Sequence, residues 1–226
     1  MNIRIIHNAK EAIGLAIIID VFRAFTLEPY VINNGVEKLI AVGDKEIAYN
    51  LKEKNKNYIL IGERNGIKLA GFDYGNSPSE IKNINFSNQT VVHTTSCGTQ
   101  GIVNAVNAEE IITGSLVNAK AIAKYIKENK FNNISIVSMA RPGENPSDED
   151  ELCAKYIKSL LENNILNNLD KEIENLKLTS GSKFFDKSTQ EVFPEEDFYL
   201  CTELNKFNFI LKVNKNINRM FYLEFL

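Results

Sequence analysis

Short runs of β-branched and other apolar residues, alternating with segments of helical periodicity, limit the possible folds of this chain more than any other feature. The runs are continuous rather than alternating with polar residues, which is typical of strands buried on both faces. The predicted strands are residues 15–21, 37–42, 58–62, 90–94, 110–114 and 133–138. Apolar residues recur at helical spacing in residues 44–54, 118–129 and 147–163. Strands alternating with helices predict an α/β fold, with a parallel sheet between helical layers.

The length of the chain favours one domain. At 226 residues it can bury a substantial core, and we expect a single domain spanning residues 1–226. Near the C-terminus, residues 197–213 are interpreted as two further strands around a turn at Leu204 and Asn205. These strands would make the sheet mixed.

An internal repeat is a second prediction about the organisation of the chain. Residues 17–66 are similar to residues 91–143, and residues 17–24 align with residues 91–98. The spacing of roughly 72–75 residues favours duplication of a half-domain, although any two strand–helix units share some apolar pattern. If the duplication is real, the loops after the first strand of each copy are expected to face one another. Open α/β sheets bind ligands at such strand ends.

Composition excludes several classes of partner. The net charge is −3, without the basic stretch that nucleic-acid binding requires. No apolar stretch reaches membrane-spanning length, and the first residues do not resemble a signal peptide. The three cysteines are far apart, which indicates reduced thiols and a cytoplasmic protein. With only two histidines, a zinc site is not expected. We therefore expect a small-molecule partner, with no nucleic acid and no membrane, and leave a homodimer open.

Two predicted loops each place an acid near an arginine. Asp20 ends the first buried strand, and Arg23 follows it. A buried carboxylate needs a cation or a donor-rich partner, and a guanidinium group suits phosphate or sulfonate oxygens. Glu63 and Arg64 follow the strand at residues 58–62. The alternative interpretations are a structural acid–arginine pair and an ordinary charged turn.

The segment around Asn76 and Ser77 combines a helix start with unexplained polar residues. Ser77, Pro78 and Glu80 predict an N-cap, a first helical position and a capping box. This interpretation does not account for Asp73 or Asn76, which lie beside a helix N-terminus suited to anions.

A hydroxyl-rich loop follows the predicted strand at residues 90–94. Thr94, Thr95, Gly98 and Thr99 could hold an anion through hydroxyl and backbone N–H groups. The loop has no lysine in the position of a Walker motif. Its Cys97 is a possible nucleophile but lacks the arginine that closes a cysteine-phosphatase loop, so a small buried thiol is the commoner interpretation.

Acids gather at the start of the predicted helix at residues 147–163. Ser147 with Asp150 predicts a capping box, and acids in a first helical turn favour the helix dipole. That explains one or two of the four consecutive acids at residues 148–151, and Arg141 and Glu144 lie just before them. Several carboxylates near arginine and hydroxyl groups suit magnesium, which prefers a few oxygen ligands with water and substrate phosphate.

In this order, these segments resemble the 2-phosphosulfolactate phosphatases, a family of magnesium-dependent acid phosphatases. The similar pieces are residues 19–24, 62–64, 71–73, 75–78, 94–95, 98–99, 114–115, 118–119, 149–150, 152–154 and 197–201. The resemblance covers nearly the whole chain. It implies an α/β/α fold with a mixed sheet. It also implies hydrolysis of 2-phospho-3-sulfolactate to sulfolactate and phosphate, on the route to coenzyme M. Two positions depart from the family: Cys97 stands where asparagine is usual, and Glu28 stands where an apolar residue is usual.

The resemblance and the loop chemistry together suggest roles for the metal ligands and the catalytic groups. Asp20, with Glu149 or Asp150, is expected to hold Mg²⁺. Glu63 or Asp73 is the predicted general acid. Asp20 as the attacking nucleophile stays open, and Cys153 is a lesser candidate.

A second set of residues is predicted to bind the substrate. Its members offer guanidinium, amide, hydroxyl or backbone N–H donors: Arg23, Arg64, Asn76, Ser77, Thr94, Thr95, Gly98 and Thr99. A phosphatase with a different substrate and a non-catalytic anion-binding protein are the alternatives. A dinucleotide site is not expected, because no Gly-x-Gly-x-x-Gly turn follows the first strand.

Overall fold

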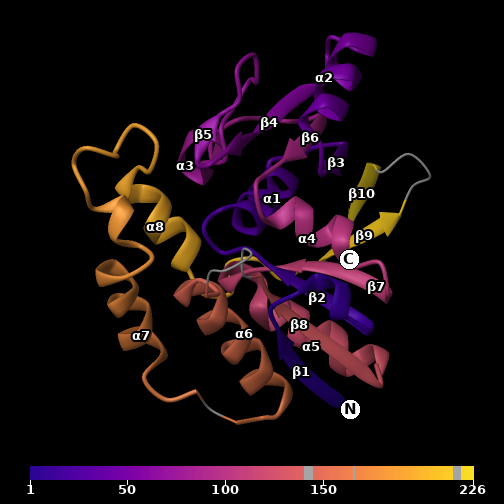
Figure 1. The fold of residues 1–226 in the computed structure, drawn as a ribbon, viewed down its shortest axis with the longest axis vertical. Helices are drawn as coiled ribbons and strands as arrows, with labels where there is room; N and C mark the ends of the chain where they lie inside the picture. The colour runs from indigo at the N-terminus through magenta and orange to yellow at the C-terminus, as the bar shows by residue number, and fades with distance from the viewer. Residues whose placement is uncertain (140–144, 165, 216–219) are drawn as a thin grey trace.

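One mixed sheet of ten strands runs through the described part of the chain (Figure 1). The computed structural model describes residues 1–139, 145–164, 166–215 and 220–226. Along the sheet the order is β1-β8-β2-β7-β9-β10-β3-β6-β4-β5. The strands are β1 (Asn2–Ile6), β2 (Gly14–Ile19), β3 (Lys38–Val42), β4 (Ile59–Arg64), β5 (Ile67–Lys68), β6 (Thr90–Thr94), β7 (Ala108–Gly114), β8 (Asn133–Ser138), β9 (Leu211–Lys215) and β10 (Met220–Phe225).

Helices lie on both faces of this sheet, so the predicted α/β fold with a mixed sheet is confirmed. The helices are α1 (Ala24–Asn33), α2 (Lys45–Lys54), α3 (Pro78–Ile81), α4 (Gly98–Asn104), α5 (Ala119–Asn129), α6 (Asp148–Leu161), α7 (Leu169–Asn175) and α8 (Glu195–Thr202). Short 3-10 turns lie at η1 (Ala9–Glu11), η2 (Leu116–Asn118), η3 (Leu176–Leu178) and η4 (Ser182–Phe184). No helix in the described ranges combines the length and the apolar character needed to cross a membrane.

The burial of β2 shows why the strand runs are continuously apolar. Leu15, Ile17 and Ile19 pack in one core cluster with residues of α5 and α6. Ala16 and Ile18 belong to a second cluster on the opposite face, with residues of α1 and α4. Because both faces are covered, every residue of β2 is buried.

The sheet contains two parallel groups that run in opposite directions. In one group β2 pairs with β7 and β8, and in the other β6 pairs with β3 and β4. Between the groups, β9 and β10 make successive antiparallel pairs with β7, with each other and with β3. In a flat sheet this reversal would put the loops after β2 and β6 at opposite ends of the strands. The two loops nevertheless meet, since Gly98 lies against Asp20.

The predicted repeat agrees with an interleaved arrangement of strands. In each copy the elements follow in the order strand, helix, strand, helix, strand. The first strand of each copy lies between the two later strands of the other copy, since β2 separates β8 from β7 and β6 separates β3 from β4. Residues 140–143, the end of the second predicted copy, lie outside the described residues. The duplication itself stays a prediction.

The strand predicted from residue 197 is wrong, because this segment begins within helix α8. Pro194 is its N-cap, and Glu195, Glu196 and Asp197 give its first turn the negative charge that a helix N-terminus favours. Phe198, Cys201 and Thr202 then fall on one buried face at helical spacing. The strands that make the sheet mixed are β9 and β10, further along the chain.

Gly98, the first residue of α4, allows the loops after β2 and β6 to meet. A Cβ atom at this position would lie 2.8 Å from Asp20 Oδ2 and 3.0 Å from Ala24 Cβ and Phe25 Cζ. These neighbours surround the start of α1, so any larger side chain at Gly98 would push the two loops apart.

Gly98→Ala should therefore lower the free energy of unfolding by about 1–3 kcal/mol, the usual cost of overpacking. Gly75→Ala is the matched control, because its Cβ would meet chiefly the end of the Glu80 side chain at 3.2 Å. Urea unfolding of both variants measures the difference. Equal stability of the two variants would contradict the close packing described here.

Candidate active site

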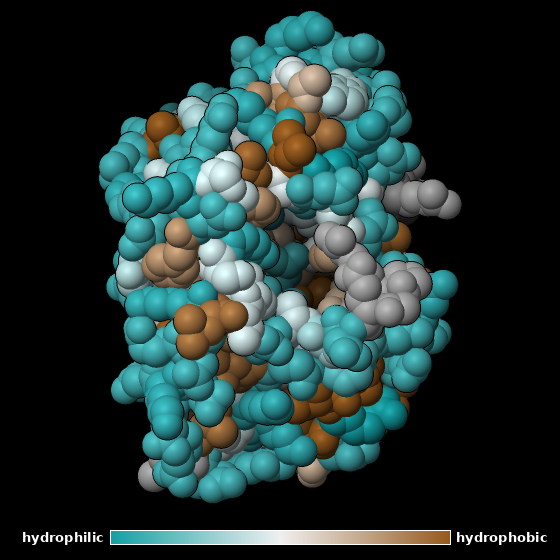
Figure 2. All heavy atoms as spheres, turned by 60° about the vertical axis from the view of Figure 1, so that its left-hand side comes forward, coloured by the Kyte–Doolittle hydropathy of each residue, from teal (hydrophilic) through white to brown (hydrophobic). Residues whose placement is uncertain are grey.

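A cavity of about 220 Å³ lies where the loops after β2, β4 and β6 meet. Asp20, Arg23, Glu63, Asn76, Cys97 and Lys183 contribute to its lining. The surface on the side of α7 and α8 is mainly hydrophilic and is hollowed near its middle (Figure 2). The cavity thus collects acidic, amide and cationic groups from segments far apart in the sequence.

Asp20 is a buried carboxylate at the wall of this cavity. Its Oδ1 accepts a hydrogen bond from the backbone N–H of Ala24 at 3.1 Å, which fixes the side chain at the start of α1. Burial raises the pKa of Asp20 to about 6, and the negative charges of Glu63 and Glu149 add to the rise. The Ala24 hydrogen bond and the His93 side chain oppose it in part.

Asp150 and Glu149, in the first turn of α6, are buried close to Asp20. Asp150 Oδ1 accepts from the backbone N–H of Val21 at 2.8 Å and so ties α6 to the loop after β2. Burial raises the pKa of Asp150 well above its usual range, and the charges of Glu149 and Asp20 raise it further. Glu149 is 4% exposed, and its Oε2 has no hydrogen-bond partner among the described residues. The predicted capping box is absent, because Ser147 makes no side-chain cap hydrogen bond.

These carboxylates fit a cation only in part. Mutual repulsion and an unpartnered buried oxygen are conditions that a divalent ion would relieve. However, within the described ranges no three His, Cys, Asp or Glu side chains are gathered so that they could hold a metal ion. At most two protein carboxylates would then ligate Mg²⁺ directly, with water and substrate oxygens completing its shell, as that ion commonly requires.

Arg23 reaches the cavity, but its guanidinium group already has partners. Nη1 donates to Asp197 Oδ2 at 2.8 Å and to the carbonyl of Val192 at 2.9 Å, and both charged side chains are almost fully buried. The ring of Phe193 lies 4.8 Å from its Cζ. Arg23 therefore holds α8 against the loop after β2, and its capacity to clamp a phosphate is smaller than the sequence suggested.

Glu63 acts as a brace between two loops. Its Oε2 accepts from Gly66 N at 2.6 Å and from Ser96 Oγ at 3.1 Å, while Oε1 accepts from Ser96 N at 2.6 Å. All three contacts use the carboxylate oxygens as acceptors, so both oxygens are occupied in holding the two loops together. This placement does not support the predicted role of Glu63 as a general acid.

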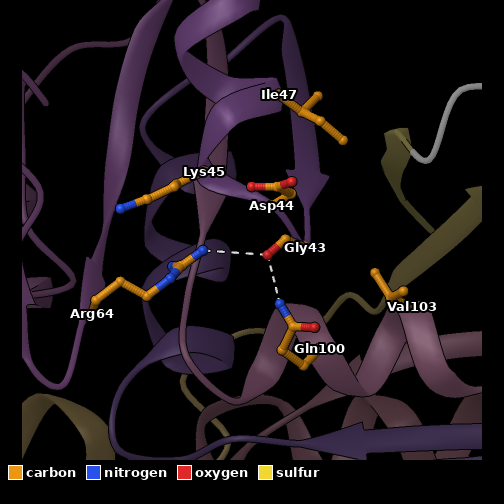
Figure 3. A pocket seen from close by; sticks show the side chains of 7 residues that line it. All are labelled: Gly43, Asp44, Lys45, Ile47, Arg64, Gln100 and Val103. Carbon is orange, nitrogen blue, oxygen red and sulfur yellow. Dashed lines mark hydrogen bonds between the residues drawn. The ribbon is translucent and has the colours of Figure 1, made fainter.

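Arg64 does not line the Asp20 cavity but a separate one of about 350 Å³, where it lies opposite Gly43 and Gln100 (Figure 3). Its Nη2 donates to Thr94 Oγ1 at 3.0 Å and to the carbonyl of Gly43 at 3.2 Å, and Gln100 donates to the same carbonyl. Lys45 lies on this side as well. The predicted convergence of Arg64 and Thr94 on the Asp20 cavity is therefore not seen.

Thr95 and Thr99 form hydrogen bonds with each other around the start of α4. Thr99 Oγ1 accepts from Thr95 N at 3.0 Å, and Thr95 Oγ1 accepts from Thr99 N at 3.1 Å. Both threonines are buried, whereas the neighbouring Ser96 and Cys97 reach the cavity. The hydroxyl-rich loop thus shapes the cavity wall, and the contribution of Thr95, Gly98 and Thr99 to substrate binding stays a prediction.

Two predicted catalytic residues do not line the cavity. Asp73 is partly exposed and accepts from Lys52 Nζ at 3.0 Å and from Leu60 N at 2.8 Å, which makes it a support for β4. Cys153 is fully buried in the core between the sheet and α6. Burial, followed by the charge of Asp150, raises the pKa of Cys153 well above its usual range, so the thiolate needed for attack is disfavoured.

Asn76 lines the cavity, and Ser77 lies beside it in an adjoining cavity of about 510 Å³. Ser77 Oγ donates to Asp197 Oδ1 at 2.9 Å. Ser77 and Pro78 begin α3 as predicted, but the capping box does not form, because Glu80 accepts from the backbone N–H of Gly75. Asp197 is therefore the shared anchor of Arg23 and Ser77.

Lys183 is a cavity residue that the sequence pattern did not identify. It lies in η4, with Nζ 5.3 Å from the ring centre of Phe193 and 5.8 Å from that of Phe22. Residues 169–193 carry no strong periodicity, so only the packing of these rings shows that this lysine reaches the Asp20 loop. Arg141 and Glu144, also singled out in the sequence, lie outside the described residues.

Loss of the buried Asp197 charge should strongly destabilise the folded protein. Asp197→Asn leaves the Arg23 guanidinium buried without its counter-charge, and the free energy of unfolding should fall by about 3 kcal/mol or more. Its neighbour Glu196 pairs with Lys82 at an exposed site, so Glu196→Gln should cost under about 1 kcal/mol. Chemical denaturation distinguishes the two. A small effect of Asp197→Asn would show that the pair does not hold α8.

The stability of the protein should fall as pH rises through about 6 in the absence of divalent ions. Asp20 and Asp150 have pKa values raised above the ordinary value of 3.8, so the unfolded chain releases their protons first. Both are protonated in either state only well below pH 3.8, so their cost to folding develops as pH rises from that value and is complete above their raised pKa values. Asp150→Asn should flatten this decline when urea midpoints are measured from pH 4 to pH 8 with a chelator. Asp148→Asn, at an exposed position in the same turn, is the control. Parallel curves for wild type and Asp150→Asn would refute the assignment.

Comparison with known proteins finds relatives that match most of this chain. A family model described as 2-phosphosulpholactate phosphatase matches residues 4–216. A probable 2-phosphosulfolactate phosphatase of Bacillus subtilis (strain 168) is 32% identical over 213 residues, covering 93% of this chain and 91% of the relative. One of Thermoplasma volcanium is 34% identical over 205 residues, covering 90% and 92%. A third, of Caldicellulosiruptor saccharolyticus, is 39% identical over 168 residues, covering 73% and 68%.

Proposed function

Because the chain belongs to the 2-phosphosulfolactate phosphatase family of phosphoric monoester hydrolases, we propose that it hydrolyses 2-phospho-3-sulfolactate or a related small phosphorylated acid. The observation that carries the proposal is the cavity at Asp20, whose lining also includes the cation of Lys183 and the amide of Asn76, while the buried Glu149 of α6 interacts with Asp20. A phosphate ester needs both kinds of group, since its charge must be neutralised and its oxygens must be positioned.

The proposal includes a magnesium ion held at the carboxylates. Asp20 with Glu149 or Asp150 would supply its protein ligands, for the reasons of repulsion and burial given above. When bound, the ion would neutralise charge on the transferring phosphate and polarise it. A cytoplasmic location and a place on the route to coenzyme M are further parts of the proposal, and they rest on the family resemblance alone.

The chain's own residues would bind and orient the ester. The Asn76 amide and the Lys183 ammonium face the cavity and can donate to phosphate or sulfonate oxygens. Glu63 keeps the loops after β4 and β6 at a fixed separation, and Arg23 with Asp197 keeps α8 in place. Asp20 as a nucleophile is the second possibility for that residue, since Oδ1 is fixed by Ala24. Trapping an acyl phosphate would distinguish it from a ligand role.

Phosphate release from 2-phosphosulfolactate, set against simpler phosphomonoesters, tests the proposal. With Mg²⁺ the wild type should turn over the sulfonated ester, and a chelator should abolish the activity. Asp20→Asn should lower kcat/KM by roughly 100-fold or more, because the ion contributes several kcal/mol to such reactions. Asp170→Asn, an exposed acid on α7, is the matched control. Undiminished turnover in Asp20→Asn would refute the assignment, and phosphate binding without turnover in wild type would favour a non-catalytic anion-binding protein.

A further inference from the structure

A row of three buried polar side chains, those of Glu28, His93 and Asn76, leads from the core to the cavity. His93 of β6 lies between Glu28 of α1 and Asn76, with Nδ1 3.0 Å from Glu28 Oε1 and Nε2 3.1 Å from Asn76 Oδ1. Glu28 and His93 are fully buried, and Asn76 is 6% exposed. The hydroxyl of Thr113 donates to the second Glu28 oxygen at 3.2 Å. Every polar group of this row up to Asn76 Oδ1 therefore has a hydrogen-bond partner.

The number of protons on the His93 ring determines the direction of the hydrogen bonds along this row. Both ring nitrogens of His93 face oxygen acceptors, and only a doubly protonated ring can donate to both. A buried imidazolium needs a counter-charge, which the Glu28 carboxylate provides at hydrogen-bond distance. Burial raises the pKa of Glu28, while the hydrogen bond and the charge of His93 oppose this rise. Asp20 is a further anion that interacts with the His93 charge.

The oxygen of the Asn76 amide bonds to His93, whereas its NH₂ group is available for a ligand. Its oxygen faces His93, and its Nδ2 donates no hydrogen bond to another residue in the described ranges. Asn76 lines the Asp20 cavity and also the adjoining 510 Å³ cavity, so it lies where the two join. An amide more than nine-tenths buried, with two free N–H groups at a cavity wall, lacks only an acceptor.

We propose that the Glu28–His93 ion pair is a positioning device, which holds Asn76 with its oxygen toward the core and its NH₂ group toward an anionic oxygen of the ligand. This inference rests on the proposed function for the identity of the ligand as a phosphate ester. Glu28 and His93 touch no ligand and act through Asn76. A neutral ring whose single proton faced the Glu28 carboxylate would instead present a lone pair at Nε2, and the amide would then turn its NH₂ group inward.

The paired variant Glu28→Leu/His93→Leu is the most informative, because it removes the ion pair as a unit and leaves no buried charge without its partner. Asn76 Oδ1 then has no donor to hold it, and the dissociation constant of inorganic phosphate, measured calorimetrically with Mg²⁺ present, should rise roughly tenfold. KM for the ester should rise by a similar factor with kcat nearly unchanged. Asn76→Ala should weaken phosphate binding similarly, and adding it to the paired variant should cause little further loss.

Two controls separate positioning from a general structural effect. Glu28→Gln/His93→Leu, alone and with Asn76→Ala, repeats the cycle should the paired leucine variant fold poorly, because it also removes the donor to Asn76 and the charge of residue 28. Ser135→Ala removes a buried hydroxyl bonded to Ile13, remote from both cavities, and should leave phosphate affinity unchanged. Additive losses when Asn76→Ala is combined with either paired variant, or unchanged affinity in the paired variants, would overturn the inference.

Nitrogen-15 NMR shows directly whether one or both ring nitrogens of His93 carry a proton. The chain has only two histidines, so a His7→Gln variant assigns the His93 signals. Wild type should show a doubly protonated His93 ring at pH 7, and a neutral ring would overturn the inference. The substitutions could affect phosphate affinity non-additively in a protein that does not hydrolyse 2-phosphosulfolactate. That result would refute the proposed function and leave the positioning role of the ion pair standing.

Discussion

The close approach of Gly98 to Asp20 is the contact on which the candidate site depends. It joins the loop after β6 to the loop after β2, although the two strands belong to parallel groups of opposite direction. Glu63 strengthens the junction, since its carboxylate accepts from both Gly66 and Ser96. The cavity is the space that remains between these loops and is closed on one side by Lys183.

Buried charge is distributed unevenly around that cavity. Arg23 and Asp197 neutralise one another, as do His93 and Glu28. Asp20, Glu149 and Asp150 form no ion pair with a cation in the described ranges, so burial and mutual repulsion together raise the pKa values of Asp20 and Asp150. An ion pair that is already matched stabilises the fold, whereas unmatched carboxylates disfavour it until a cation binds. This contrast separates structural from ligand-binding charges better than residue type does.

Strand positions were predictable from sequence because burial on both faces leaves a continuous apolar run, as in β2 and β8. Helix α8 was not predictable in this way, because its aromatic residues Phe198 and Tyr199 are also common in strands. Among site residues, Asp20 was identified by its place after a strand, and Asn76 by its place before a predicted helix N-terminus. The direction of Arg64 and the partner of Arg23 were not, since both depend on which distant segment packs alongside. Lys183 shows the same limit, because ring packing alone brings it to the site.

A crystal structure with Mg²⁺ and inorganic phosphate would test the central claim, that the ligand site is the cavity between the β2 and β6 loops. The account predicts phosphate beside Asn76 and Lys183, with the metal ion at Asp20. Phosphate held instead by Arg64 and Lys45 in the separate cavity, with no ion at Asp20, would contradict it.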